Sequence, residues 1–119
     1  MQVIFLLEKT VEVGMLFDYY GKLLTDKQQK INKLYYYHDL SLGEIAEKIG
    51  ISRQGVYDHL HRSEKLLREY ESQMNLIKKY HLFKDRLDQI MSFINDEIEL
   101  ETDKKEQLSK EIKDLKKFL

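Results

Sequence analysis

Residues 53–62 (RQGVYDHLHR) include the side chains of this sequence that are best suited to contact another molecule. The guanidinium of Arg53 could donate to guanine or bind a phosphate, and the amide of Gln54 could pair with adenine. The ring of Tyr57 could contact a phosphate or a thymine methyl. These residue types are typical of a helix that reads a DNA groove.

Helical geometry indicates which residues of this stretch are available for such contacts. If Val56 and Leu60 lie on the buried side of a helix, the residues on its opposite side must face solvent. The candidate DNA- or partner-binding residues are therefore Arg53, Gln54, Tyr57, Asp58, His61 and Arg62.

Asp58 fits this interpretation poorly. Phosphates repel a carboxylate in the major groove unless the carboxylate accepts a hydrogen bond from cytosine N4. A pairing with Arg62, four residues on, would also neutralise a basic residue that could bind DNA. A solvated Asp58–Arg62 pair without any binding role is an equally good interpretation.

The segment before this stretch predicts the turn that positions it. Ser41 and Glu44 form a capping-box pattern, which begins a short helix over residues 42–49. Gly50 suits the left-handed end of that helix. Ser52 then caps a fourth helix, which extends to about Glu71.

Small and apolar side chains are expected to pack these two helices against each other. Ala46 lies where the helices cross most closely, and Val56 and Leu60 hold the second helix on the first. This order of residues predicts a helix-turn-helix.

The chain as a whole predicts an all-α fold, because it has no proline and 34% charged residues. A first helix is expected over residues 6–23, and Thr25 with Gln28 caps a second helix from Asp26. The stripe expected to be buried in the first helix comprises Val11, Met15, Leu16, Tyr19 and Leu23.

An apolar stripe continues from residue 74 to residue 98, with a break expected around residues 79–81. The last helix is expected to begin near Asp103, capped with Glu106 at its third position. Its a/d-type seam consists of Leu108, Ile112, Leu115 and Leu119. A helical hairpin, or packing on a partner chain, would explain this seam. The expected organisation is an N-terminal helix (1–24), a helix-turn-helix (25–71) and a C-terminal helical extension for dimerisation or partner binding (72–119).

Charge and composition narrow the possible functions. Twenty Lys and Arg residues against 21 Asp and Glu residues give a net charge of −1, so any contact with DNA must be local. Within residues 52–68 there is a modest basic excess, because Arg53, Arg62, Lys65 and Arg68 outnumber Asp58 and Glu64.

No catalytic residues are predicted, because no nucleophile, base and orienting group occur in a recognisable pattern. No metal site and no cofactor are expected: the sequence has no cysteine, and His59 and His61 face different sides of a helix. The run Tyr35-Tyr36-Tyr37 predicts packing residues, because consecutive helical positions cannot form one stacking platform. No apolar run approaches the ~18 residues of a membrane span, and no signal sequence is recognised, so a cytoplasmic location without membrane insertion is expected.

The segment LTDKQQKINKLYYYHDLSLGEIAEKIGISRQGVYDHLHRSEKLL is similar to the C-terminal helix-turn-helix of bacterial sigma factors. Over about residues 9–80, the chain also resembles the YlxM family of small cytoplasmic proteins of Gram-positive bacteria. The segments that carry this resemblance are LFDYYGKLLTDKQ, SLGEIAEKIGISRQGVYDHLHR and EKLLREYE. The most specific part is SRQGVYD, residues 52–58. Gly55 departs from the alanine common in the family, and residues after about 81 match only in being helical and charged.

This resemblance implies an all-helical DNA-binding regulator associated with the signal recognition particle pathway, because family members are encoded beside the particle's GTPase. The first hypothesis is binding to double-stranded DNA by a homodimer. The alternative is an adaptor that binds the protein or RNA of the signal recognition particle. A third possibility is that the motif serves only as a folding unit.

Overall fold

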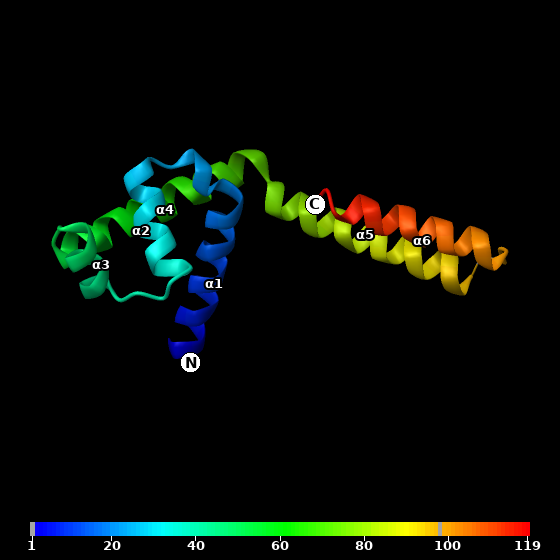
Figure 1. Ribbon diagram of the computed structural model, residues 1–119, viewed down its shortest axis with the longest axis horizontal. Coiled ribbons are helices and arrows are strands. Elements are labelled where there is room, and N and C mark those ends of the chain that lie inside the picture. Colours follow the sequence, from blue (N-terminus) through cyan, green and yellow to red (C-terminus); the bar gives the residue numbers. More distant parts are fainter. Residues whose placement is uncertain (1, 98) are drawn as a thin grey trace. The chain divides into compact units, whose positions relative to one another are not determined.

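The computed structural model describes the backbone of residues 2–97 and 99–119 and the side chains of residues 8–97 and 99–119. The described residues form helices and no strand, which confirms the all-α class. In chain order, the helices are α1 (Gln2–Tyr20), the 3-10 turn η1 (Gly21–Leu23), α2 (Asp26–Tyr36), α3 (Leu42–Ile49), α4 (Arg53–Met74), α5 (Leu76–Asp96) and α6 (Thr102–Lys116) (Figure 1). None of the described helices is long and apolar enough to cross a membrane.

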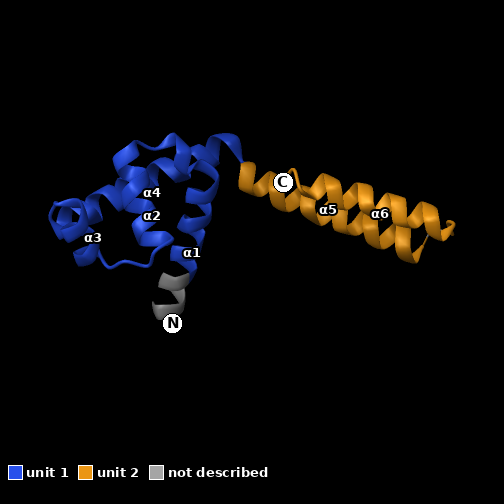
Figure 2. Ribbon diagram, viewed as in Figure 1, with its two compact units in different colours: residues 1–75 blue, residues 76–119 orange. Residues whose placement is uncertain are grey.

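The chain divides into two compact units, residues 1–75 and residues 76–119 (Figure 2). Unit 1 contains α1 to α4, and unit 2 contains α5 and α6. Each unit has its own set of packed helices.

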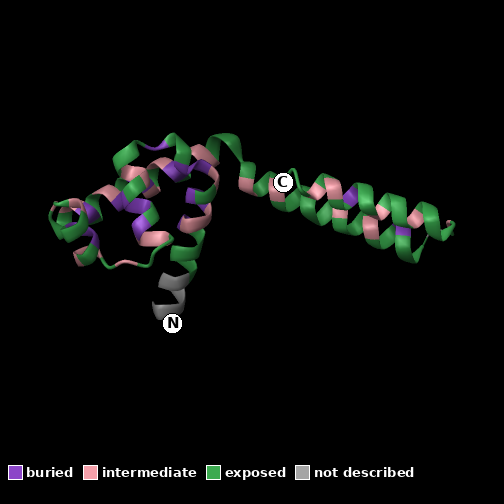
Figure 3. Ribbon diagram, viewed as in Figure 1, coloured by how far each residue is buried: buried purple, intermediate pink, exposed green. Residues whose placement is uncertain are grey.

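The helix-turn-helix core of unit 1 lies where α2, α3 and α4 meet (Figure 3). Its buried side chains are Ile31, Leu34, Ile45, Ala46, Val56 and Leu60. Ile45 and Val56 are both fully buried, so the expected packing of α4 on α3 is confirmed. Ala46 is also buried, as a close crossing of two helices requires.

A buried polar contact also joins α2 to α4. Asn32 Nδ2 donates to the hydroxyl of Ser63 at 3.0 Å, and both residues are fully buried. The Ser63 hydroxyl donates in turn to the carbonyl of His59 at 2.7 Å. Because buried polar groups need partners, this contact favours one alignment of the two helices.

The stripe expected to be buried on α1 is partly wrong. Val11 is 69% exposed and Leu23 is 55% exposed. Among the described side chains of α1, those of Val13, Leu16, Phe17 and Tyr20 are buried. Residues 13, 16, 17 and 20 share one face of an α-helix. The 3-10 turn at residues 21–23 then changes the rotation from one residue to the next, so the α-helical spacing no longer applies. As a result Leu24, and not Leu23, is buried.

The bounds of the last three helices also differ from those expected. α5 runs without interruption from Leu76 to Asp96, so the break expected at residues 79–81 is wrong. The chain turns instead at Asn75, which has a left-handed backbone with φ 54° and ends α4 at Met74. Asparagine is one of the few residues with a side chain that adopt this conformation readily.

The cap expected for α6 is also corrected. Glu101, and not Asp103, occupies the position before the helix, and its side chain makes no capping hydrogen bond. Within the expected seam Ile112 is buried, whereas Leu108, Leu115 and Leu119 are 39%, 54% and 40% exposed. Ile98, at the end of the apolar stripe, lies outside the described residues, as do the side chains of residues 1–7.

Candidate nucleic-acid interface

The turn between α3 and α4 is built from the residues that the sequence indicated. Ser41 and Glu44 form a complete capping box, with both hydrogen bonds at 3.1 Å. Gly50 has φ 80° and donates its N–H to the carbonyl of Ala46 at 2.9 Å. The hydroxyl of Ser52 accepts from the N–H of Gly55 at 3.0 Å, which caps α4. These contacts fix the point at which α4 begins.

The first three turns of α4 expose all six candidate residues to solvent: Arg53, Gln54, Tyr57, Asp58, His61 and Arg62. Their exposure follows from the burial of Val56 and Leu60 on the other side of the helix. The structure therefore gathers them on one surface, while their role in binding stays a prediction.

Asp58 is held in place by its own helix. Its carboxylate accepts a hydrogen bond from Gln54 Nε2 at 3.0 Å. Arg62 Nε donates to the backbone carbonyl of Asp58 at 3.3 Å, so the guanidinium approaches the main chain of Asp58. Among the described residues, no ion pair joins the Asp58 carboxylate to Arg62. The arginine thus keeps its charge available, but Gln54 would have to leave Asp58 to pair with adenine.

Arg53 lies against the start of α3. A Cβ atom placed on Gly43 would come within 3.0 Å of both Nε and Nη2 of Arg53. The glycine therefore leaves room for the guanidinium beside the helix-turn-helix turn. A contact between Arg53 and a base or phosphate would need only a rotation of this exposed side chain.

Tyr57 and His61 form a pair on the side of the surface that faces α1. Their rings are stacked, with centroids 5.9 Å apart and planes 8° apart. They line an open cleft of about 380 Å³, together with Lys9 and Val13 of α1 and Tyr35 and Tyr36 of α2. Sequence patterns could not indicate this cleft, because its walls come from separate helices.

The tyrosine run packs against its surroundings, as its sequence suggested. The rings of Tyr35 and Tyr36 meet edge to face, with centroids 4.9 Å apart. The ring of Phe17 on α1 lies 5.4 Å from the ring of Tyr37, centroid to centroid. The three tyrosines therefore do not form a single stacking platform.

Positive charge gathers at the other edge of the candidate surface. The pKa of His59 is lowered from its ordinary value, first by burial and then by the positive charges of Arg62 and Lys27. Lys27 belongs to α2, so it joins this edge only through the packing of α2 on α4. Lys27 could not be found from the sequence, because no local pattern connects it to α4. Both positive charges are therefore close enough to His59 to act on it, and the negative charge of Asp58 acts in the opposite sense.

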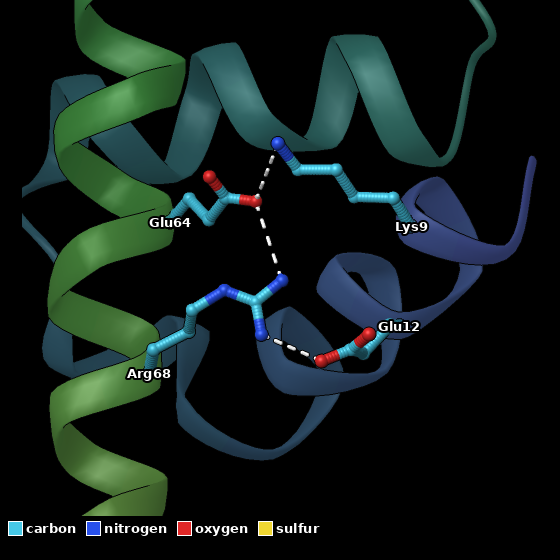
Figure 4. Close-up of polar contacts among 4 residues, drawn as sticks. All are labelled: Lys9, Glu12, Glu64 and Arg68. Carbon is cyan, nitrogen blue, oxygen red and sulfur yellow. Dashed lines mark hydrogen bonds and ion pairs between the residues drawn. The ribbon is translucent and has the colours of Figure 1, made fainter. Parts of the chain in front are cut away.

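Part of the basic excess in residues 52–68 is used within the fold. Arg68 pairs with Glu12 at 2.5 Å and with Glu64 at 3.4 Å, and Lys9 pairs with Glu64 at 3.6 Å (Figure 4). This chain of ion pairs attaches α1 to α4, and the carboxylate of Glu12 raises the pKa of Arg68. Arg68 therefore belongs to the scaffold, and Arg53, Arg62 and Lys65 remain as basic residues for a partner.

The candidate surface offers no recognisable metal chemistry. Within the described part of the chain, no group of three or more His, Asp or Glu side chains could hold a metal ion. The available chemistry is that of hydrogen bonding, aromatic contact and charge.

Comparison with known proteins agrees with the helix-turn-helix geometry. Residues 7–115 match the UPF0122 family, described as "Putative helix-turn-helix protein, YlxM / p13 like". A UPF0122 protein of Streptococcus pneumoniae is 42% identical over 102 residues, covering 81% of this chain and 93% of that protein. A relative from Halalkalibacterium halodurans is 44% identical over 90 residues, covering 76% of this chain and 83% of the relative. A relative from Bacillus thuringiensis is 52% identical over 75 residues, covering 63% and 68% respectively.

The match extends beyond the helix-turn-helix. It includes α1 from residue 7, the whole of α5, and α6 up to residue 115, so the family model covers both units. The chain therefore belongs to the UPF0122 family of YlxM/p13-like helix-turn-helix proteins.

Proposed function

We propose that the protein is a cytoplasmic, non-enzymatic regulator that binds double-stranded DNA by placing the first three turns of α4 in the major groove. The observation that carries this proposal is the exposed surface of α4, with Arg53 at one end and Arg62 at the other. A major groove about 12 Å wide accepts an α-helix, and guanidinium groups suit both guanine and phosphate.

The construction of α4 supports this mode of binding. The helix has 22 residues, and the ion pairs that attach it to α1 use Glu64 and Arg68, beyond the six candidate residues. Val56 and Leu60 anchor the opposite side of its first turns in the core. The DNA-facing residues are therefore presented by a supported helix, which limits the entropy lost on binding.

The test is a binding titration against duplexes selected from a randomised pool, followed by fluorescence anisotropy at several salt concentrations. Affinity should fall as salt rises, because phosphate contacts release counterions. Arg53→Ala should weaken binding by about 1–3 kcal/mol if Arg53 reads a guanine.

Lys22→Ala is the matched control for Arg53→Ala, because it also removes one exposed positive charge. Lys22 is two residues after Tyr20 in the chain. The Tyr20 hydroxyl donates at 2.5 Å to Glu71, near the end of α4 that is opposite to the six candidate residues. This control should bind DNA as the unaltered chain does. Binding that resists salt and is indifferent to Arg53→Ala would refute DNA reading by α4.

Asp58 supports a second candidate function, binding to the protein or RNA of the signal recognition particle. Its exposed carboxylate lies in the middle of the surface and is oriented by Gln54. A protein partner could supply a basic side chain to that carboxylate, whereas DNA supplies mostly negative charge. The resemblance to the YlxM family is the reason for testing this particle and not another partner.

The second candidate is tested by co-purification with the reconstituted particle, and separately with its GTPase and its RNA. Loss of the complex in Asp58→Asn would support a protein contact at this surface. The same substitution should strengthen DNA binding, because it removes a charge that phosphates repel and keeps a hydrogen-bonding side chain. The direction of the change in each assay therefore distinguishes the two candidates.

A further inference from the structure

Unit 2 leaves most of its large apolar side chains exposed. Of the described residues in 76–119, only Ile94 and Ile112 are buried. The exposed apolar side chains are Leu76, Leu82, Phe83, Ile90, Phe93, Leu108, Leu115, Phe118 and Leu119. A hairpin of two helices has too little core to bury such a set by itself.

Two contacts fix the antiparallel alignment of α5 and α6. Lys105 Nζ donates to the carbonyl of Asn95 at 3.3 Å, and the ammonium of Lys116 pairs with the carboxylate of Asp88. Continuing this alignment places Phe93 near the level of Leu108 and Ile90 near the level of Glu111. It also places Arg86 near the level of Leu115.

The exposed side chains form regular stripes. On α5, Leu76, Phe83 and Ile90 are spaced by seven residues and are 43%, 55% and 48% exposed. On α6, Leu108 and Leu115 are also seven residues apart. A seven-residue apolar spacing is typical of a helix surface that packs lengthwise against another helix.

Both stripes lie on the same face of the hairpin. Ile90 directly precedes the half-buried Met91 on α5, and Leu108 directly precedes the half-buried Ser109 on α6. On each helix, the exposed stripe therefore lies about 100° around the helix axis from the residues that face the other helix. On both helices this displacement is toward the preceding residue in the chain. Because the helices are antiparallel and face each other, equal rotations bring the two stripes to one side.

We propose that this face is covered by a second copy of the chain, which forms a four-helix bundle with the hairpin of the first. The charges within the face favour a second copy over an unrelated helix. Arg86 interrupts the stripe of α5, and Glu111 interrupts the stripe of α6; both are exposed. Neither takes part in an ion pair among the described residues.

A two-fold axis along the hairpin satisfies both charges at once. It lays α5 of each copy over α6 of the other, with the helices antiparallel. The level of Arg86 in one copy then lies within about one helical turn of Glu111 in the other. Since each copy supplies both charges, two equivalent ion pairs form across the apolar face. The pairing needs no nucleic acid, so it goes beyond the proposed function and can fail or succeed independently of it.

The first test is sedimentation velocity of the full chain without DNA, at tens of micromolar. The expected species has twice the 14.4 kDa mass of one chain. Ile90→Glu should weaken the dimer by about ten-fold or more, because it buries an unpaired charge. Ser92→Glu adds the same charge about 160° away around the helix and should leave the dimer intact.

Circular dichroism should show that both variants remain helical, so that a lost dimer is not mistaken for unfolding. A monomeric parent chain would overturn the proposal, as would equal effects of Ile90→Glu and Ser92→Glu. A dimer that neither substitution weakens would also overturn it.

The second test uses reversed charges to separate pairing between chains from pairing within one chain. Arg86→Glu alone and Glu111→Arg alone should each disfavour a homodimer, because like charges then meet across the interface. A mixture of the two variants should form a heterodimer, since every pair between the chains is again of opposite sign. If the mixture stays monomeric while the parent chain dimerises, the proposed alignment is wrong.

Discussion

At the scale of single residues, the turns between helices depend on a few residues whose backbone has a left-handed conformation. Gly50 and Asn75 both have left-handed backbones, with φ 80° and φ 54°, and each follows the last residue of a helix. Glycine adopts this conformation without a steric penalty, whereas a Cβ atom raises its energy. Gly50 therefore determines where α3 stops.

Gly50→Ala should lower the free energy of unfolding by about 1–2 kcal/mol, because alanine is strained at positive φ. Gly14→Ala is the matched control, since Gly14 is inside α1 and a Cβ there would lie 3.6 Å from Tyr36 Cδ1, an ordinary contact. That control should raise the free energy of unfolding by up to about 1 kcal/mol through helix propensity. Urea denaturation measures both, and changes of the same sign would contradict this account.

His59 gives unit 1 a defined dependence on pH. Its pKa in the folded chain lies below the ordinary value of 6.5, so the unfolded chain binds a proton first as the pH falls. Stability should therefore decrease as the pH drops below about 6.5, and His59→Gln should flatten this part of the curve. The test is to measure the midpoint urea concentration of unfolding for both proteins at several pH values between about pH 7.5 and about pH 5. If the free energy of unfolding of His59→Gln changes with pH as steeply as that of the unaltered chain, groups other than His59 cause the loss of stability.

At the scale of elements, α1 and α4 are joined by both apolar and charged contacts. Tyr20 and Leu67 are almost fully buried in unit 1, and the four-residue chain of ion pairs lies along the same pair of helices (Figure 4). The side chain of Glu64 is only 14% exposed, whereas those of Glu12 and Arg68 are 60% and 42% exposed. The charged contacts should therefore contribute less than the apolar ones.

Arg68→Gln should lower the free energy of unfolding by up to about 1 kcal/mol at low salt, and by less at high salt, because its partners are partly exposed. Lys117→Gln is the control, since its ion pair with Asp114 involves a lysine side chain that is 79% exposed. Little change is expected for that control. Urea denaturation at two salt concentrations provides the measurement, and an effect of Arg68→Gln that salt does not reduce would argue against a charge mechanism.

At the scale of the whole molecule, the two units have separate cores. Every buried side chain of the helix-turn-helix core belongs to residues 1–75, whereas Ile94 and Ile112 belong to unit 2. Residues 1–75 should therefore fold without residues 76–119. In the proposed dimer, unit 2 would instead determine how many copies of α4 act together.

A fragment of residues 1–75 should show a cooperative urea transition and bind a single DNA half-site as the full chain does. It should bind a duplex with two half-sites about a hundred-fold less tightly than the full chain, because avidity is lost. Anisotropy with one-site and two-site duplexes measures this difference. Equal affinities of fragment and full chain for the two-site duplex would contradict a role of unit 2 in joining two copies.

The helix-turn-helix could be predicted without any structure, because its signals are local. Capping serines, Gly50 and the apolar spacing of Ile45, Val56 and Leu60 depend only on neighbouring residues, and the structure confirms them. The exposure of the six candidate residues followed from the same periodicity.

By contrast, the buried face of α1 and the charges that remain free for a partner depend on contacts between helices. Val11 and Val13 are equally apolar, and the phase of packing on α4 exposes the first and buries the second. Likewise, Glu12 is brought beside Arg68 from 56 residues away and adds to the local pair of Arg68 with Glu64, whereas Arg62 makes no ion pair among the described residues. Periodicity reports contacts within one helix, whereas the pairing of helices depends on side chains that are far apart in the sequence.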